Sequence, residues 1–260
     1  MYRILPTFGG DPRAVSEVVR NIMDGKTNNT GTLTLATGGA TTTTLIDRRI
    51  GRNSVILFVP ASAAAFADYS PYGAFQDGTD QTVANTTTAY PITFDTTDYS
   101  NGVTLSNSSR LNVKVAGMYN IQFSIQLKNT TNDSQDVDIW FRKNGSDVVA
   151  SNSKFGLAPR KASGDPYHLI GAMNFYVDLA ANDYIQLMWR ASDTGVVIEH
   201  YVAGTSPTRP LTPSVIATVN LVSLAASTNI YASSQGQGTA TITHFANSTA
   251  NKTYRYAIIG

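Results

Sequence analysis

The residue types that most often carry catalysis are scarce in this sequence and are not spaced for it. The three histidines, His168, His200 and His244, are isolated in strand-like segments, with no second ligand at the spacing of a zinc site. The chain has no cysteine, which excludes thiolate nucleophiles, Cys-based zinc sites and disulfide bonds. Nucleophile elbows, His-Glu-x-x-His helices and Walker loops do not occur. We therefore expect no catalytic residues and no cofactor, and we interpret the histidines as structural or solvent-facing.

Carboxylates cluster in a segment that could hold a metal ion. Asp133, Asp136 and Asp138 offer hard oxygen ligands of the kind that calcium prefers. Their spacing is not that of an EF-hand, so we expect no metal and keep calcium at these three residues as the alternative. A pair of acids that cleaves sugars must face each other across a groove, which the sequence does not show, so a polysaccharide depolymerase also stays an alternative.

Composition limits the partners of the chain. Its 260 residues are 42% hydrophobic, enough for a sizeable core, and 19 basic residues against 18 acidic ones give a formal net charge of +1. A basic stripe for nucleic acid is therefore not expected.

The start has no leader-like apolar stretch, and the longest apolar run, residues 55–67, is broken by Pro60. We expect cytosolic synthesis and no membrane insertion.

One segment, residues 11–25, has helical periodicity. Asp11 suits the N-cap, Pro12 suits the first turn and Gly25 suits the exit. An apolar stripe on one face favours core packing, or a short docking anchor if the chain forms an oligomer. The stripe consists of Val15, Val18, Val19 and Ile22.

Everything after Lys26 is typical of strands and turns, so the predicted fold class is all-β. Residues 54–59 are apolar on both faces, which predicts a central strand covered on each side. Neighbouring strands near the N-terminus cannot cover it alone, but the C-terminal segment has suitable partners. We therefore expect both chain ends to build one small β domain around an insertion.

The middle of the chain has a regular alternation of apolar and polar residues. In residues 118–128, Tyr119, Ile121 and Phe123 point one way and the polar residues between them point the other way. About eight such strands predict a jelly-roll sandwich. The expected division is an N-terminal arm and helix (1–27), a discontinuous small β domain (28–89 and 225–260) and a jelly roll (90–224).

Three large side chains break this alternation by pointing to the expected wet face. They are Trp140, Tyr176 and Met188. Aromatic residues and methionine are enriched in the cores of protein interfaces, so these residues are candidates for the interface of a homotrimer. Covering by loops or by the helix is the alternative.

The middle region resembles the trimeric jelly rolls of the tumour necrosis factor and complement globular-head superfamily. Residues 117–123, Gly-Met-Tyr-Asn-Ile-Gln-Phe, resemble its Gly-x-Tyr-x-x-x-Phe strand, and residues 137–145 resemble its strand that ends in Lys-Asn-Gly. Residues 177–187 resemble its Leu-x-x-x-Asp-x-(aromatic or aliphatic)-x-Leu segment. This resemblance covers about half of the chain and implies a jelly roll that trimerises.

The two flanks resemble small structural proteins of short-tailed marine phages. The similar segments are residues 9–25, 28–35 and 53–60, and the C-terminal segment from 240–244 through 253–260. The resemblance implies a virion protein, assembled in the host cytoplasm, in which the jelly roll is an insertion between docking segments. A tail or head fiber that contacts other virion proteins and a host surface glycan is the expected role, and a capsid decoration or cement protein is the alternative.

Overall fold

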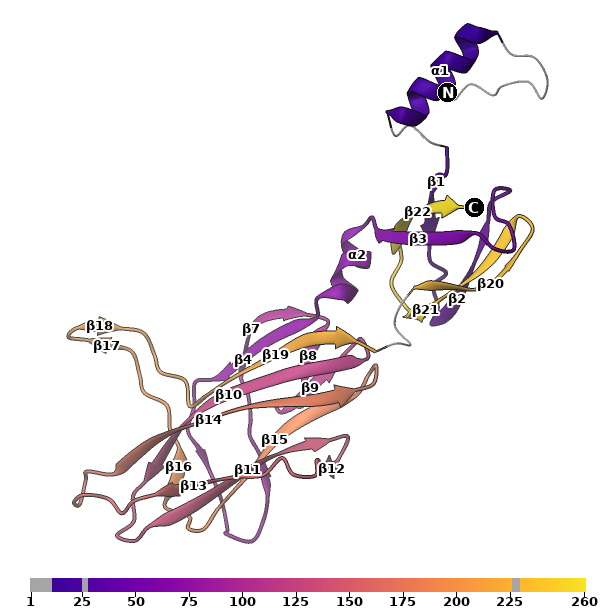
Figure 1. The fold of residues 1–260 in the computed structure, drawn as a ribbon. Coiled ribbons are helices and arrows are strands. Elements are labelled where there is room, and N and C mark those ends of the chain that lie inside the picture. Colours follow the sequence, from indigo (N-terminus) through magenta and orange to yellow (C-terminus); the bar gives the residue numbers. More distant parts are fainter. Residues whose placement is uncertain (1–10, 25–27, 226–229) are drawn as a thin grey trace. The chain divides into compact units, whose positions relative to one another are not determined.

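The structure is a computed structural model that describes residues 11–24, 28–225 and 230–260. Strands make up 56% of it and helices 8%, which confirms the predicted all-β class. The chain divides into two compact units, coloured along the sequence in Figure 1. Unit 1 is Met1–Phe66 with Asn229–Gly260, and unit 2 is Ala67–Thr228.

Unit 1 combines segments from both ends of the chain. Its elements are α1 (Pro12–Met23), β1 (Thr30–Thr34), β2 (Ala40–Ile46), β3 (Val55–Pro60), α2 (Ala63–Phe66), β20 (Tyr231–Gly236), β21 (Thr239–Asn247) and β22 (Thr253–Ile259). Its strands form two antiparallel sheets, in the orders β1-β22-β3 and β2-β21-β20. In each sheet a C-terminal strand lies at the centre.

Strand β3 does not lie where its composition predicts. It is an edge strand that pairs with β22, and Val55, Leu57 and Val59 on one of its faces are exposed. The prediction of a central, doubly covered strand was therefore wrong, because an apolar run shows the preference of the side chains and not the number of neighbouring strands. The predicted pairing of this segment with the C-terminal residues is confirmed, from Tyr254↔Pro60 to Ile259↔Val55.

The core of unit 1 is small, and part of it comes from the C-terminal strands. It consists of Leu33, Leu35, Leu45, Ile50, Ala65, Ala240, Ile242, Tyr254, Tyr256 and Ile258. Helix α1 begins after Asp11, whose carboxylate accepts a hydrogen bond of 3.1 Å from the backbone N–H of Arg13, as an N-cap should. The expected exit residue Gly25 lies outside the described residues.

Unit 2 is a sandwich of two antiparallel sheets. Its elements are η1 (Ala67–Tyr69), β4 (Tyr72–Asp77), β5 (Gln81–Thr82), β6 (Tyr90–Pro91), β7 (Thr96–Asn101), β8 (Val103–Ser106), β9 (Arg110–Val113), β10 (Gly117–Asn129), β11 (Gln135–Lys143), β12 (Ser146–Asp147), β13 (Ser153–Leu157), β14 (Tyr167–Leu179), β15 (Tyr184–Ala191), β16 (Val196–Ile198), β17 (Gly204–Thr205), β18 (Thr208–Arg209) and β19 (Val215–Leu224). The short β17–β18 hairpin extends away from the two sheets (Figure 1).

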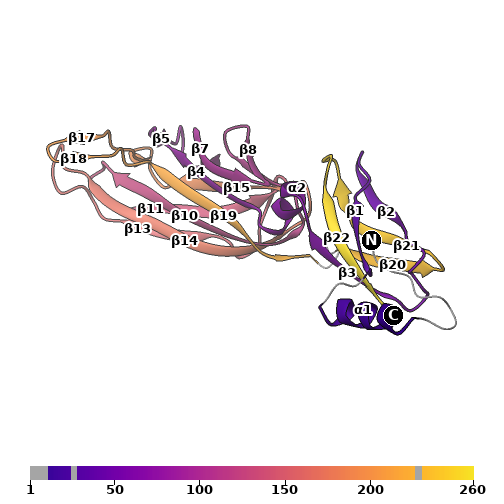
Figure 2. The same ribbon diagram turned by 90° about the horizontal axis from the view of Figure 1, so that it is seen from above.

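The first sheet of unit 2 runs β14-β10-β19-β4-β7, and β16 and β5 continue it beside the end of β10. The second sheet runs β11-β15-β9-β8, with β12 and β13 on the outer side of β11 and β6 beside β15. The 13-residue strands β10 and β14 lie side by side along the first sheet (Figure 2).

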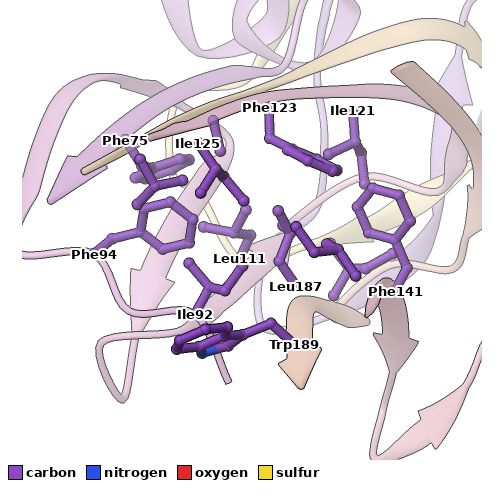
Figure 3. Packing of buried hydrophobic residues seen from close by; sticks show 14 of the residues in the cluster. Phe75, Ile92, Phe94, Leu111, Ile121, Phe123, Ile125, Phe141, Leu187 and Trp189 are labelled. Carbon is purple, nitrogen blue, oxygen red and sulfur yellow. The ribbon is translucent and has the colours of Figure 1, made fainter. Parts of the chain in front are cut away.

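A single hydrophobic core fills the space between the two sheets (Figure 3). Phe123 and Ile125 of β10 meet Phe141 and Leu187 from the second sheet. The Phe123 and Phe141 rings lie edge to face, with centroids 6.1 Å apart. Trp189, 1% exposed, closes the core near Ile92. The alternation that predicts these strands therefore also identifies the side that is buried.

The border between the units differs from the predicted one. The sequence predicts residues 67–89 in the small β domain, but they belong to unit 2. Strand β4 pairs with β19 and β7, and Phe75 is fully buried in the sandwich core. The short polar segments between β4 and β6 give no periodic pattern, so sequence patterning placed the border at the first clear alternation instead.

Candidate functional site

The predicted docking residues lie on one exposed face of α1. Val15, Val19 and Ile22 are exposed and Val18 is half-buried. The helix is therefore amphipathic as predicted, with Ala14 as its buried residue. What its apolar stripe contacts stays a prediction.

The three predicted interface residues do not share a surface. Trp140 on β11 and Met188 on β15 are directly opposite each other in the second sheet, whereas Tyr176 belongs to β14 in the first sheet. Met188 is 2% exposed, so it cannot contact another copy of the chain, and this part of the prediction was wrong. It is buried because Trp140 lies opposite it on one side and Pro91 of β6 on the other.

Tyr176 lies on the outer face of the first sheet, together with other exposed apolar groups. Ile170 lies on the same face of β14, and Ile216 and Tyr72 lie on neighbouring strands. Polar residues such as Gln122 separate them. We call this surface the β14–β4 face. It mixes exposed aliphatic and aromatic side chains with uncharged amides, a composition that suits a protein interface.

Trp140 instead lines a hollow on the outer face of the second sheet. The hollow has a volume of about 340 Å³ and is lined by Asp138, Trp140, Asp147, Val148, Ala150, Asn152 and Arg190. We call it the Trp140 hollow. It combines one half-buried aromatic ring with carboxylates, an amide and a guanidinium group.

The strand pairing explains why a hollow forms at this point. Strand β11 pairs with β13 as far as Ile139 and with β12 only from Arg142, so no strand lies beside Trp140 on that edge. The intervening residues 148–152 cross the gap as a connection, in which Ala150 has a left-handed backbone with φ of 59°. Ser151 secures the connection: its buried Oγ accepts from the N–H of Phe141 at 3.0 Å and donates to the carbonyl of Val148 at 2.8 Å.

The carboxylate of Asp147 is held by two donors. The indole Nε1–H of Trp140 donates to its Oδ1 at 2.9 Å and the Nε–H of Arg142 donates to the same atom at 2.7 Å. These bonds, that of Arg142 first, hold the pKa of Asp147 below its ordinary value. Arg142 holds the carboxylate, the carboxylate holds the indole ring, and the second oxygen, Oδ2, is left for another donor.

Asp138 lies two residues before Trp140 on the same face of β11, and its carboxylate is bound less tightly than that of Asp147. Its carboxylate receives Asn152 Nδ2 at 3.3 Å, Arg190 Nη1 at 3.4 Å and Lys154 Nζ at 3.4 Å. All three contacts are at the long end of hydrogen bonding. A better-placed donor could therefore replace one of them.

The candidate calcium ligands do not assemble into a metal site. Over residues 11–24, 28–225 and 230–260, no group of three or more histidine or acidic side chains is placed to hold a metal ion. Lys154 forms ion pairs of 3.4 Å with both Asp136 and Asp138, and Arg190 forms a second ion pair with Asp138, so these carboxylates already pair with side-chain cations. Asp133 contributes its backbone carbonyl to Asn129 instead.

The three histidines have protein partners. His168 Nδ1 lies 2.9 Å from the hydroxyl of Tyr201 and 3.3 Å from Glu199 Oε2. His200 Nδ1 lies 2.6 Å from Asp80 Oδ1. His244 is buried, with Nε2 2.8 Å from Thr43 Oγ1. The contacts of His168 and His200 hold strand ends and connections together, and the contact of His244 joins β21 to β2, in keeping with the structural interpretation of the histidines.

None of the helices in the described part of the chain has the length and apolar character needed to cross a membrane.

Comparison with protein-family models and with curated proteins gives no match. The class that the fold defines is thus an all-β protein with a two-sheet sandwich set into a small β unit.

Sequence patterning missed most of the Trp140 hollow. It singled out Trp140 as a large residue on a polar face, but Asp147, Asn152 and Arg190 come from three other segments that no spacing connects. A usable signal was present in β11 itself, where Asp138, Trp140 and Arg142 alternate with fully buried residues. This pattern places an aromatic ring between two charges on one face.

Proposed function

We propose that this chain is a non-enzymatic structural protein of a tailed phage, of the tail-fiber or head-fiber type. In this proposal unit 1 docks on the particle, unit 2 forms a homotrimer, and the jelly roll faces outward to attach to a glycan of the host surface.

The division of the chain carries the proposal. Both sheets of unit 1 need strands from both chain ends, so unit 2 is an insertion into a unit that is complete without it. An inserted domain can diversify its binding surface while the docking unit keeps its own core. The phage-like flanking segments 28–35, 53–60 and 253–260 contain β1, β3 and β22 and thus form one sheet.

Exposed apolar residues in unit 1 support docking by that unit. Val55, Leu57 and Val59 form a row on the edge strand β3, and Ile259 is exposed on the neighbouring β22. An unblunted apolar edge of this kind invites a partner protein. In the proposal another virion protein covers it.

The β14–β4 face supports the homotrimer. Its exposed apolar residues lie on the sheet that contains the Gly-x-Tyr-x-x-x-Phe-like strand β10. In the proposal this face, and not the Trp140 and Met188 pair, lies between the copies.

The test is the position of the chain on the particle. Phage particles are labelled with gold-coupled antibodies against the whole chain and imaged by electron microscopy, with antibodies against a major capsid protein as the control. Label at the tail or on discrete head projections supports the fiber role. Label spread evenly over the head indicates a decoration protein instead, and unlabelled particles contradict a virion role. Release of reducing ends from host polysaccharide by the purified chain would contradict the non-enzymatic part.

A further inference from the structure

We propose that the Trp140 hollow binds one neutral hexopyranose unit of a glycan. This inference rests on the proposed attachment role and names the site and the class of ligand. The hollow is distinct from the β14–β4 face, because it lies on the second sheet.

The aromatic ring provides the platform. One face of a pyranose ring presents C–H groups with partial positive charge, and the face of an indole ring is partly negative, so the two attract each other in addition to burying apolar area. Trp140 is half-buried and its Nε1–H is bound to Asp147 Oδ1 at 2.9 Å, so the ring is held in one orientation. Because it is fixed before binding, little conformational entropy is lost.

Polar groups surround the ring in the way that sugar hydroxyls require. A hydroxyl both donates and accepts hydrogen bonds. Asp147 and Asp138 can accept from it, whereas Asn152 and Arg190 can donate to it. Asp147 keeps Oδ2 for a new donor, and the contacts of Asp138 at 3.3 and 3.4 Å are long enough to be exchanged for shorter ones.

The charge of the hollow favours a neutral ligand. Asp147 is paired with Arg142, and Asp138 is paired with Arg190 and Lys154, so the positive and negative groups balance locally. A uronic acid would bring a carboxylate next to two aspartates and should bind less well. The volume of about 340 Å³ lies at the lower end of the range for ligand pockets, roughly 300–1,000 Å³, which suits a ligand of one or two rings.

The two tryptophans of the chain allow a direct test. Trp189 is buried in the core, so changes in fluorescence on adding a sugar report on Trp140. The whole purified chain is titrated with methyl glucoside, methyl galactoside and methyl mannoside, with glucuronic acid as the charged control and sorbitol as the ringless control. We expect saturable binding of at least one neutral glycoside with a Kd on the order of 1–10 mM, as is usual for weak single-unit contacts.

Variants then assign the binding to the hollow. Trp140→Ala should weaken binding about 10-fold or more, measured by saturation-transfer NMR because the reporter is lost. Asp147→Asn keeps the shape and removes the charge, so it tests the polar frame even if Trp140→Ala folds poorly. Tyr231→Ala, which removes an exposed aromatic ring from unit 1, is the matched control and should bind as the parent chain does.

The outcomes separate the site from the attachment role. The inference fails if no neutral glycoside gives a saturable signal, or if folded Trp140→Ala and Asp147→Asn bind like the parent chain. Binding of the labelled chain to host cells is measured in parallel. If the variants still bind cells, attachment stands and this site is wrong; if the parent binds glycosides through Trp140 but no cells, the site stands and the attachment role is wrong.

Discussion

The hydroxyl of Tyr256 donates a hydrogen bond of 2.8 Å to Oδ2 of Asp47, and so joins the last strand of the chain to the connection after β2. Arg49 binds the same carboxylate through its backbone N–H at 3.0 Å and its Nε–H at 2.8 Å, and its Nη2 reaches the carbonyl of Thr30. Asp47 and Arg49 together therefore connect three segments of unit 1. They are well placed to hold the two chain ends together.

This network predicts a loss of stability in acid. The hydrogen bond from Arg49, with smaller contributions from its backbone N–H and from Tyr256, holds the pKa of Asp47 well below its ordinary value of 3.8, although burial opposes the shift. A depressed folded-state pKa means that the contribution is fully present above the unfolded pKa and is lost as pH falls below about 4. Asp47→Asn should lower the stability of unit 1 by about 1–3 kcal/mol at pH 7 and by less in acid.

The measurement must report on unit 1 alone. Trp140 and Trp189 both lie in unit 2, so tryptophan fluorescence does not follow unit 1. Hydrogen exchange of the β22 amides, measured by mass spectrometry at pH-corrected rates, is the suitable readout. Equal destabilisation of Asp47→Asn at every pH would contradict the linkage.

A glycine opposite Tyr256 predicts a steric effect. Gly31 of β1 pairs with Tyr256, and a Cβ atom at this glycine would lie 2.3 Å from the Tyr256 ring. Gly31→Ala must displace the ring and with it the hydrogen bond to Asp47, so we expect a loss of about 1–3 kcal/mol in unit 1. Gly39→Ala is the comparison for the loss of a glycine without a clash, because nothing lies within 4 Å of its Cβ position. Gly39 has φ of +83°, so its substitution measures backbone strain alone.

Alternation along strands made much of the fold predictable. Tyr119, Ile121 and Phe123 are buried as their spacing indicates, because one side of β10 faces the core. The order of the strands was harder to predict from the sequence, because the apolar segment that forms β3 is an edge strand and not the expected central one. Short strands such as β5 have too few residues for a periodic pattern, so the border between the units was misplaced.

The candidate site was predictable only at Trp140. A large residue on a polar strand face indicates a contact, but the pattern does not say with what. Met188 also points to the polar side of its strand, but it is buried within its own chain, with Trp140 and Pro91 on either side. The segment around Pro91 has no periodic pattern, so the sequence does not predict this burial. The other residues of the Trp140 hollow come together where neither β12 nor β13 pairs with β11. This gap is visible only in the strand pairing of the structure.

The homotrimer makes a prediction about mass. Sedimentation equilibrium should give three times the chain mass of 27.9 kDa. Tyr176→Glu and Ile216→Glu together place charge on the β14–β4 face and should yield monomers, because two unpaired carboxylates would be desolvated in the interface. Val149→Glu, on an exposed residue of the connection between β12 and β13, should leave the mass unchanged. A monodisperse monomer of the parent chain at micromolar concentration would contradict the trimer.

A substitution of Met188 tests whether this side chain is buried within one copy of the chain or between copies. Met188→Ala removes a side chain that is enclosed by Trp140 and Pro91, so unit 2 should lose about 2–5 kcal/mol in urea unfolding followed by tryptophan fluorescence. The oligomer mass of the folded variant should equal that of the parent chain. If Met188→Ala changes the oligomer mass but not the stability of unit 2, Met188 contributes to the interface between copies and the prediction is wrong.

Ser151 links the stability of unit 2 to the shape of the Trp140 hollow. Its buried Oγ accepts from the N–H of Phe141, so Ser151→Ala leaves that N–H without its partner and should destabilise unit 2 by about 1–3 kcal/mol. The connection over residues 148–152 also loses the bond to Val148, so the hollow should widen and glycoside binding should weaken together with stability. Val149→Ala, in the same connection but almost fully exposed, should change neither property. Unfolding in urea and glycoside titration of the same two variants measure both, and a Ser151→Ala chain that loses stability but binds glycosides like the parent would show that the connection does not shape the site.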